Sequence, residues 1–235
     1  MLYEELKQDI RFNEGINSCM SCGTCTAICP AEEVYPYQPR SIAEIVSTKD
    51  DHQIEELLKS DTIWYCGECM SCKTRCPRGN APGLIIMALR ALSIKKGFFT
   101  ESEKGRQQLV LKRTIGEWSY KHGYCIHVQH LNTEMFPELG PIFDFEKANI
   151  EALMERVGAS YNQDKPGALR KIPQDALDEI NSIFEVTGAH AQFSHIEQES
   201  FKKAKEMKLD LKPSGIDSEY IHHIFTHNDE DKHSC

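Results

Sequence analysis

Residues 19–30 read CMSCGTCTAICP, and residues 66–77 read CGECMSCKTRCP. Both stretches follow the pattern C-x2-C-x2-C-x3-C-P, in which x is any residue. The chain has ten cysteines, and eight of them belong to these two copies. Three thiols at steps of three can line one face of a compact inorganic cluster, while the turn before the proline displaces the fourth. The repeat therefore predicts two 4Fe–4S clusters, each completed by the last cysteine of the other copy.

Each predicted cluster thus takes its four ligands from both copies of the motif. The first cluster is predicted to be held by Cys19, Cys22, Cys25 and Cys76, and the second by Cys66, Cys69, Cys72 and Cys29. A zinc site usually closes around one ion with two pairs of ligands, which these triplets fit poorly. Disulfides are disfavoured in a reducing compartment. Because all eight cysteines are used as ligands, neither cluster is expected to offer a free position to a substrate.

Composition restricts the class of protein further. The 235 residues include 36 acidic and 27 basic side chains, giving a net charge of −9, which argues against general nucleic-acid binding. The apolar runs are too short for a transmembrane segment, and no secretory signal is evident. We therefore expect a cytoplasmic protein, either free or held at a membrane by its partners. Residues 61–113 carry ten basic and four acidic side chains, which favours docking of an acidic redox partner there.

The sequence around the motifs predicts a mainly α protein. Pro39 and the pair Asp50 and Asp51 are typical helix starts. Pro82 and Gly97 enclose LIIMALRALSIKK, an apolar helix expected at the centre of its domain. Further helices are predicted over residues 175–187 and 196–207. The predicted domains are an α-helical two-cluster ferredoxin domain (1–115), an irregular insert (116–171), a helical C-terminal region (172–210) and a tail (211–235).

Two cysteines lie outside the motifs. Cys125 is close in sequence to His122, His127 and His130, a group that could bind a metal but is more typical of packed or surface side chains. Cys235 is the last residue of the sequence and is expected to be a single thiol. We expect neither cysteine to contribute to the iron content.

The motifs and their flanks resemble the C subunit of heterodisulfide reductase. The resemblance rests on YQPRSIAEIV, WYCGECMSCKTRCPRG, ALRALSIKKGF and, more loosely, ALDEINSIFEVTGA. It implies a helical ferredoxin fold similar to that of succinate dehydrogenase and fumarate reductase iron–sulfur proteins. It also implies a non-catalytic electron-transfer component of a hetero-oligomer. Such a component relays electrons between a flavin-bearing A subunit and a B subunit whose CCG motifs act on disulfides.

Two branches of that family are compatible with the sequence. The segment 116–171 and the long tail extend beyond the compact methanogen form, which favours the heterodisulfide-reductase-like complex of sulfur oxidisers, where lipoate-binding proteins take part indirectly. One alternative is a methanogen enzyme that reduces the CoM–CoB heterodisulfide. Another is an iron–sulfur subunit of a different flavin dehydrogenase, such as anaerobic glycerol-3-phosphate dehydrogenase. A binding module with purely structural clusters is a further alternative.

Overall fold

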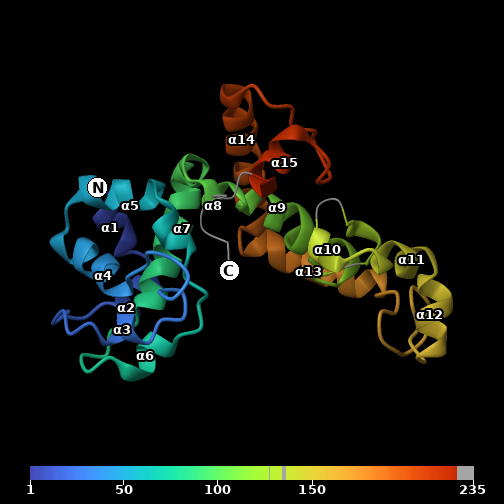
Figure 1. Ribbon diagram of the computed structural model, residues 1–235, viewed down its shortest axis with the longest axis horizontal. Helices are drawn as coiled ribbons and strands as arrows, with labels where there is room; N and C mark the ends of the chain where they lie inside the picture. The colour runs from blue at the N-terminus through green and yellow to red at the C-terminus, as the bar shows by residue number, and fades with distance from the viewer. Residues whose placement is uncertain (127, 134–135, 227–235) are drawn as a thin grey trace. The chain divides into compact units, whose positions relative to one another are not determined.

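The computed structural model describes residues 1–126, 128–133 and 136–226 and divides the chain into two compact units, with the boundary between Arg106 and Gln107. Helices and turns form both units, and no strand occurs in these residues (Figure 1). The mainly α prediction is therefore confirmed. Our division of the chain at residues 115, 171 and 210 remains a prediction.

The first unit is built around the central helix α7 (Pro82–Lys96). This helix contacts α1, α2, α4 and α5, which lie beside it in Figure 1. Several of its apolar side chains, among them Ile85 and Leu89, are completely buried with Ile54 and Leu58 of α5. The other elements of the unit are α1 (Leu2–Leu6), α2 (Ile10–Gly15), α3 (Thr24–Ala27), α4 (Pro39–Thr48), α5 (Asp51–Lys59), η1 (Asp61–Trp64), α6 (Ser71–Arg75), η2 (Phe98–Glu101) and α8 (Glu103–Arg106).

The predicted starts and stops of these helices are confirmed. Pro39 occupies the first turn of α4, where its missing N–H costs nothing. Asp50 caps α5, because its carboxylate accepts a hydrogen bond of 2.9 Å from the backbone N–H of His52. Gly97 ends α7 in the left-handed conformation (φ 76°), which glycine adopts without steric cost. Local sequence signals therefore determine where the scaffold of this unit turns.

The second unit contains the long helices α13 (Gln174–Val186) and α14 (Ala189–Met207), which contact each other. Helix α10 packs against α13, and α9 packs against α14. The remaining elements are α9 (Gln108–Leu111), the π-helical turn η3 (Lys112–Gly116), α10 (Glu117–His122), η4 (Val128–His130), η5 (Pro137–Leu139), α11 (Ile142–Ala148), α12 (Ile150–Arg156) and α15 (Glu219–Thr226).

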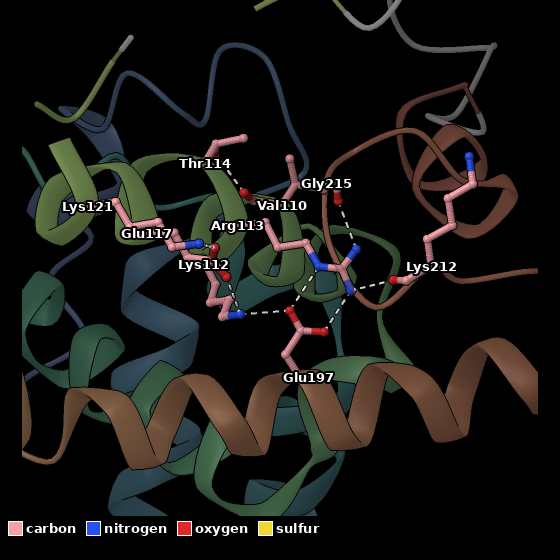
Figure 2. A network of polar contacts seen from close by, with 9 residues as sticks. All are labelled: Val110, Lys112, Arg113, Thr114, Glu117, Lys121, Glu197, Lys212 and Gly215. Carbon is pink, nitrogen blue, oxygen red and sulfur yellow. Dashed lines mark hydrogen bonds and ion pairs between the residues drawn. The ribbon is translucent and has the colours of Figure 1, made fainter. Parts of the chain in front are cut away.

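A buried network of charged side chains joins three parts of this unit (Figure 2). Arg113, on the π-helical turn, is 4% exposed and donates hydrogen bonds of 2.8 Å to both carboxylate oxygens of Glu197 on α14. It also donates to the carbonyls of Lys212 (2.9 Å) and Gly215 (2.8 Å) in the loop before α15. Lys112 bridges Glu197 to Glu117 at the start of α10. The network therefore fixes the loop, the turn and the helix to one another.

Two expectations for the second unit require correction. Residues 116–171 are not uniformly irregular, because they contain α10, α11 and α12. Two residues that favour chain turns lie at helix ends in this segment: Gly123 ends α10 in the left-handed conformation, and Pro141 directly precedes α11. Helix α14 begins at Ala189 rather than at residue 196. Gly188, in the left-handed conformation, separates it from α13, and its first turns are held by the packing of Phe193 against Phe184.

The predicted tail also contains ordered structure. Residues 219–226 form α15, and its side chains Tyr220, Ile221 and Ile224 are at most 1% exposed. The apolar residues of YIHHIF recur at helical spacing and give α15 one buried face. His227 and Cys235 lie outside the described residues.

Candidate metal centre

Two adjacent cavities in the first unit are lined by the motif cysteines. Site 1 is lined by Cys19, Cys22, Cys25 and Cys76, together with Arg40 and Arg78 and other residues. Site 2 is lined by Cys29, Cys66, Cys69 and Cys72, together with Cys25, Tyr37 and other residues. Cys76 thus lies with the first motif and Cys29 with the second, which is the grouping that the spacing predicts. All eight cysteines are free thiols.

The two motif loops share a backbone conformation that could not be predicted from the sequence. In both copies the residues on either side of the second cysteine have positive φ: Ser21 (53°) and Gly23 (78°) around Cys22, and Glu68 (54°) and Met70 (57°) around Cys69. Only one of these four residues is a glycine. For the others, this conformation costs about 1–2 kcal/mol each. Such strain persists where the surroundings require it, and here it wraps each loop around its cavity.

The two second cysteines also have matching surroundings. Cys22 and Cys69 are exposed, whereas the other motif cysteines are partly buried. The Cys22 sulfur lies 3.3 Å from the hydroxyl of Thr24, and the Cys69 sulfur 3.5 Å from that of Ser71. Hydrogen bonding to these hydroxyls lowers the pKa of both thiols. The metal-binding thiolate form is therefore favoured at the same position of each loop.

The partly buried thiols show which cysteines face one another. Burial raises the pKa of Cys29, and the nearby thiols of Cys66 and Cys69 raise it further. Burial likewise raises the pKa of Cys25, with Cys72 and Cys19 adding to the effect. Cys29 is thus electrostatically coupled to the second motif. Cys25 lines both cavities, and the thiol of Cys72 raises its pKa. These two residues therefore lie where the two sites meet.

The donor set fits a pair of iron–sulfur clusters. Each cavity is lined by at least four motif thiols and by buried donors without a hydrogen-bond partner among the described residues: Nε of Arg40 and Nδ2 of Asn80 at site 1, and the hydroxyl of Tyr37 at site 2. Buried donors in proteins normally have an acceptor. Cluster sulfides and cysteine thiolates would supply such acceptors at both sites.

Cys125 and the neighbouring histidines, a group that could bind a metal, form no such site among the described residues. Cys125 is exposed, and its sulfur lies 3.7 Å from the hydroxyl of Ser119. His127 and the side chain of His130 lie outside the residues that the structure describes. Within those residues, no three His, Cys, Asp or Glu side chains converge on a single metal ion. This applies to the motif cysteines too, whose sulfurs stand around two cavities rather than around single points.

Comparison with known proteins gives one family for the motif region and several relatives for most of the chain. The 4Fe-4S dicluster domain family matches residues 15–80. The chain is 31% identical over 206 residues to the C subunit of the ferredoxin:CoB-CoM heterodisulfide reductase of Methanosarcina acetivorans, covering 87% of this chain and 73% of that protein. It is 33% identical to the C subunit of the H(2):CoB-CoM heterodisulfide,ferredoxin reductase of Methanothermobacter marburgensis, with 74% and 76% covered. It is also 33% identical to the second iron-sulfur C subunit of the CoB–CoM heterodisulfide reductase of Methanocaldococcus jannaschii, with 59% and 70% covered.

The dicluster match, taken with the two groups of cysteines, identifies two 4Fe–4S clusters as the cofactors of this protein. The chain is therefore an iron–sulfur protein with a helical ferredoxin domain. Among the residues described, none of the helices has the length and apolar character needed to cross a bilayer.

Proposed function

The chain belongs to the family of heterodisulfide reductase C subunits, and from this premise we propose that it relays single electrons between a flavin-bearing A subunit and a disulfide-active B subunit. The observation that carries the proposal is the pair of adjacent cysteine-lined cavities in one small helical unit. When bound, each 4Fe–4S cluster can store and pass on one electron. The chain itself then acts as a connection between redox centres on its neighbours.

The ligand sets that we propose are those predicted from the spacing. Cys19, Cys22, Cys25 and Cys76 hold the cluster of site 1, and Cys66, Cys69, Cys72 and Cys29 hold that of site 2. The lining of the two cavities and the coupling of Cys29 to Cys66 support this exchange of the last cysteines. With every motif cysteine engaged as a ligand, no coordination position is left for a substrate, so the role is transfer rather than catalysis.

The residues between the sites have a definite part in this relay. Cys25 lines both cavities, and its thiol interacts electrostatically with Cys72 of the second motif. Helices α3 and α6, which carry these cysteines, contact each other. The short path from one ligand shell to the other supports transfer within the unit. Exposed Cys22 and Cys69 place an edge of each site near the surface, where partner centres can approach.

The names of the relatives bear on the terminal reaction of the complex. Their names refer to CoB–CoM heterodisulfide, and we propose reduction of that class of mixed disulfide as the reaction that this chain serves. The sulfur-oxidation prediction depended on segments beyond the methanogen form. A methanogen relative that aligns with 87% of the chain removes that argument. Sulfur oxidation remains an untested prediction.

We further propose a hetero-oligomer in the cytoplasm with the A and B subunits as the immediate partners. Anaerobic purification of the native complex tests this directly. The expected result is co-purification of a flavoprotein and of a polypeptide with CCG motifs. Isolation with a single flavin dehydrogenase, and no such polypeptide, would instead indicate the glycerol-3-phosphate dehydrogenase type. Complete absence of a paramagnetic signal after dithionite reduction would favour purely structural clusters.

Iron analysis of double variants tests the ligand exchange. The wild-type chain should carry about eight iron atoms, four per cluster. If Cys29 belongs to site 2, C29A/C69A removes two ligands from one cluster and about four iron atoms remain, whereas C29A/C22A damages both clusters. Local quartets predict the reverse outcome. Cys22 and Cys69 suit this comparison because they are the exposed members of the two loops.

A further inference from the structure

The two cluster sites differ in the charged groups around them. Arg40 and Arg78 both line site 1. The described residues that line site 2 include no charged side chain. Reduction adds one negative charge to a cluster, so a nearby cation stabilises the reduced form more than it stabilises the oxidised form. This difference in lining therefore bears on which cluster accepts an electron more readily.

Arg40 presents a buried donor to site 1. Its Nε has no hydrogen-bond partner among the described residues, although it lies on the wall of the cavity. The carboxylate of Glu44 is 3.7 Å from Nε, too far for a hydrogen bond. Glu44 instead accepts a hydrogen bond from the hydroxyl of Ser21 in the motif loop. The Nε–H of Arg40 therefore remains available to a thiolate or sulfide within the cavity.

Arg78 adds a second positive charge at the same site. Its Nε–H donates to the carbonyl of Ser18 at 3.4 Å, and no ion pair of Arg78 occurs within the described part of the chain. The carboxylate of Glu44 offsets the charge of Arg40, so the positive charge of Arg78 remains uncompensated beside site 1. Arg78 is itself exposed, so solvent screens part of this charge, whereas Nε of Arg40 is buried in the wall of the cavity.

At site 2 the buried donor is neutral, and no charged side chain accompanies it in the lining. The side chain of Tyr37 is completely buried, and its hydroxyl has no hydrogen-bond partner among the described residues. Tyr37 lines site 2 next to the thiols of Cys66 and Cys29. The ring packs edge-on against Tyr65, with 6.3 Å between centroids. The hydroxyl is thus held as a fixed, uncharged donor beside Cys66 and Cys29.

The cation of α7 that approaches the second motif loop is already neutralised. The guanidinium of Arg90 forms an ion pair of 2.6 Å with Glu68, and it donates to the carbonyls of Ile63 (2.7 Å) and Cys66 (2.6 Å). Arg90 therefore supports the backbone of the second motif loop while adding little net charge. The local balance of charge is close to zero at site 2 and positive at site 1.

We propose that the two clusters are unequal, and that Arg40 and Arg78 give the site 1 cluster the higher reduction potential while Tyr37 tunes the site 2 cluster by a neutral hydrogen bond. This inference rests on the proposed function, because it requires both clusters. In the relay, one electron leaves the site 2 cluster, which is oxidised, and arrives at the site 1 cluster, which is reduced. No bond forms or breaks. At equilibrium a single electron resides on site 1.

Redox titration of the anaerobically purified full-length holoprotein, followed by electron paramagnetic resonance, tests the assignment. Arg40→Gln and Arg78→Gln should each lower the higher of the two potentials, and Tyr37→Phe should lower the other. We expect about a tenfold decrease in the reduction equilibrium constant for each, which for one electron is about 59 mV. Arg40→Lys retains the charge and should restore much of the loss. Lys7→Gln and Tyr3→Phe are matched controls on the same unit, since neither residue lines a site and Lys7 is paired with Glu4 at the surface.

The outcomes separate this inference from the proposed function. About eight iron atoms in each variant show that both clusters are present, and fewer in the wild type would contradict the proposed function itself. With the iron content intact, the assignment is wrong if Arg40→Gln moves the lower potential. It is equally wrong if Arg40→Gln and Tyr37→Phe move the same potential, or if neither moves more than the controls. Because Arg78 projects from a loop rather than from a helix, its variant provides a second measurement should Arg40→Gln lose iron.

Discussion

Replacement of Arg113 by methionine should destabilise the second unit severely. The side chain is 2% exposed, and it donates hydrogen bonds to the carbonyls of Lys212 and Gly215 (Figure 2). Removing one partner of a buried ion pair costs about 3–5 kcal/mol, whereas the carbonyls of Lys212 and Gly215 belong to exposed residues and can bond to water once the guanidinium is gone. Glu197 loses two hydrogen bonds of 2.8 Å but retains Lys112 at 2.7 Å. The expected loss is therefore about 4 kcal/mol, the middle of that range.

Fluorescence-monitored unfolding of the full chain measures this loss in the right unit. The protein has two tryptophans, so a Trp64→Phe background leaves buried Trp118 as the reporter of the second unit. At about 4 °C per kcal/mol for a unit of this size, the midpoint should fall by about 15 °C. Lys202→Met is the matched control, because its pair with Glu199 is 67% exposed on the lysine side and is worth at most about 1 kcal/mol. Equal midpoints for Arg113→Met and Lys202→Met would refute the reasoning.

Three further predictions concern acid stability, the N-terminal helix and the cysteine outside the motifs. Burial opposes ionisation of Glu197, but its bonds to Arg113 and Lys112 outweigh burial and lower its pKa. The associated stability is therefore present above the ordinary glutamate pKa and is lost as the pH falls through the lowered value. In Glu197→Gln this loss of stability in acid should be smaller, as seen in unfolding midpoints measured from about pH 7 to pH 3. Asp51→Ala should cost about 1 kcal/mol in denaturant unfolding, since the carboxylate accepts hydrogen bonds of 2.9 Å from the backbone N–H groups of Leu2 and Tyr3; an unchanged midpoint would contradict this role. Cys125→Ser should leave the iron content unaltered, and a loss of iron would place Cys125 at a cluster.

The scaffold of the first unit could be predicted because its signals are local. Pro39, Asp50 and Gly97 each determine a helix end through the geometry or hydrogen bonding of one residue. The grouping of cysteines could also be anticipated, because the C-x2-C-x2-C-x3-C-P spacing constrains where each thiol can reach. No comparable local signal exists for much of the second unit, where short helices are joined by long-range contacts.

What could not be predicted depends on contacts between residues far apart in sequence. Arg113 and Glu197 meet across 84 residues, and either one alone is compatible with an exposed helix surface. Positive φ at Ser21, Glu68 and Met70 is imposed on side chains that normally avoid it, so composition gave no indication of these turns. The fully buried Tyr37 was visible in the sequence only as part of YQPRSIAEIV, and its position beside Cys66 required the fold.

The exchange of cysteines has a consequence for how the first unit reaches its native state. If site 2 takes Cys29 and site 1 takes Cys76, neither cavity forms until the 36 residues between Cys29 and Cys66 have folded and brought the second motif next to the first. That linker contains α4, which supplies Arg40 to site 1, and the residues just before α4 bring Tyr37 to site 2. Helix packing, ligand assembly and the tuning of both potentials therefore depend on the same segment. A cluster that binds only to the folded arrangement stabilises it by mass action, so the loss of either cluster should weaken the whole unit rather than one loop.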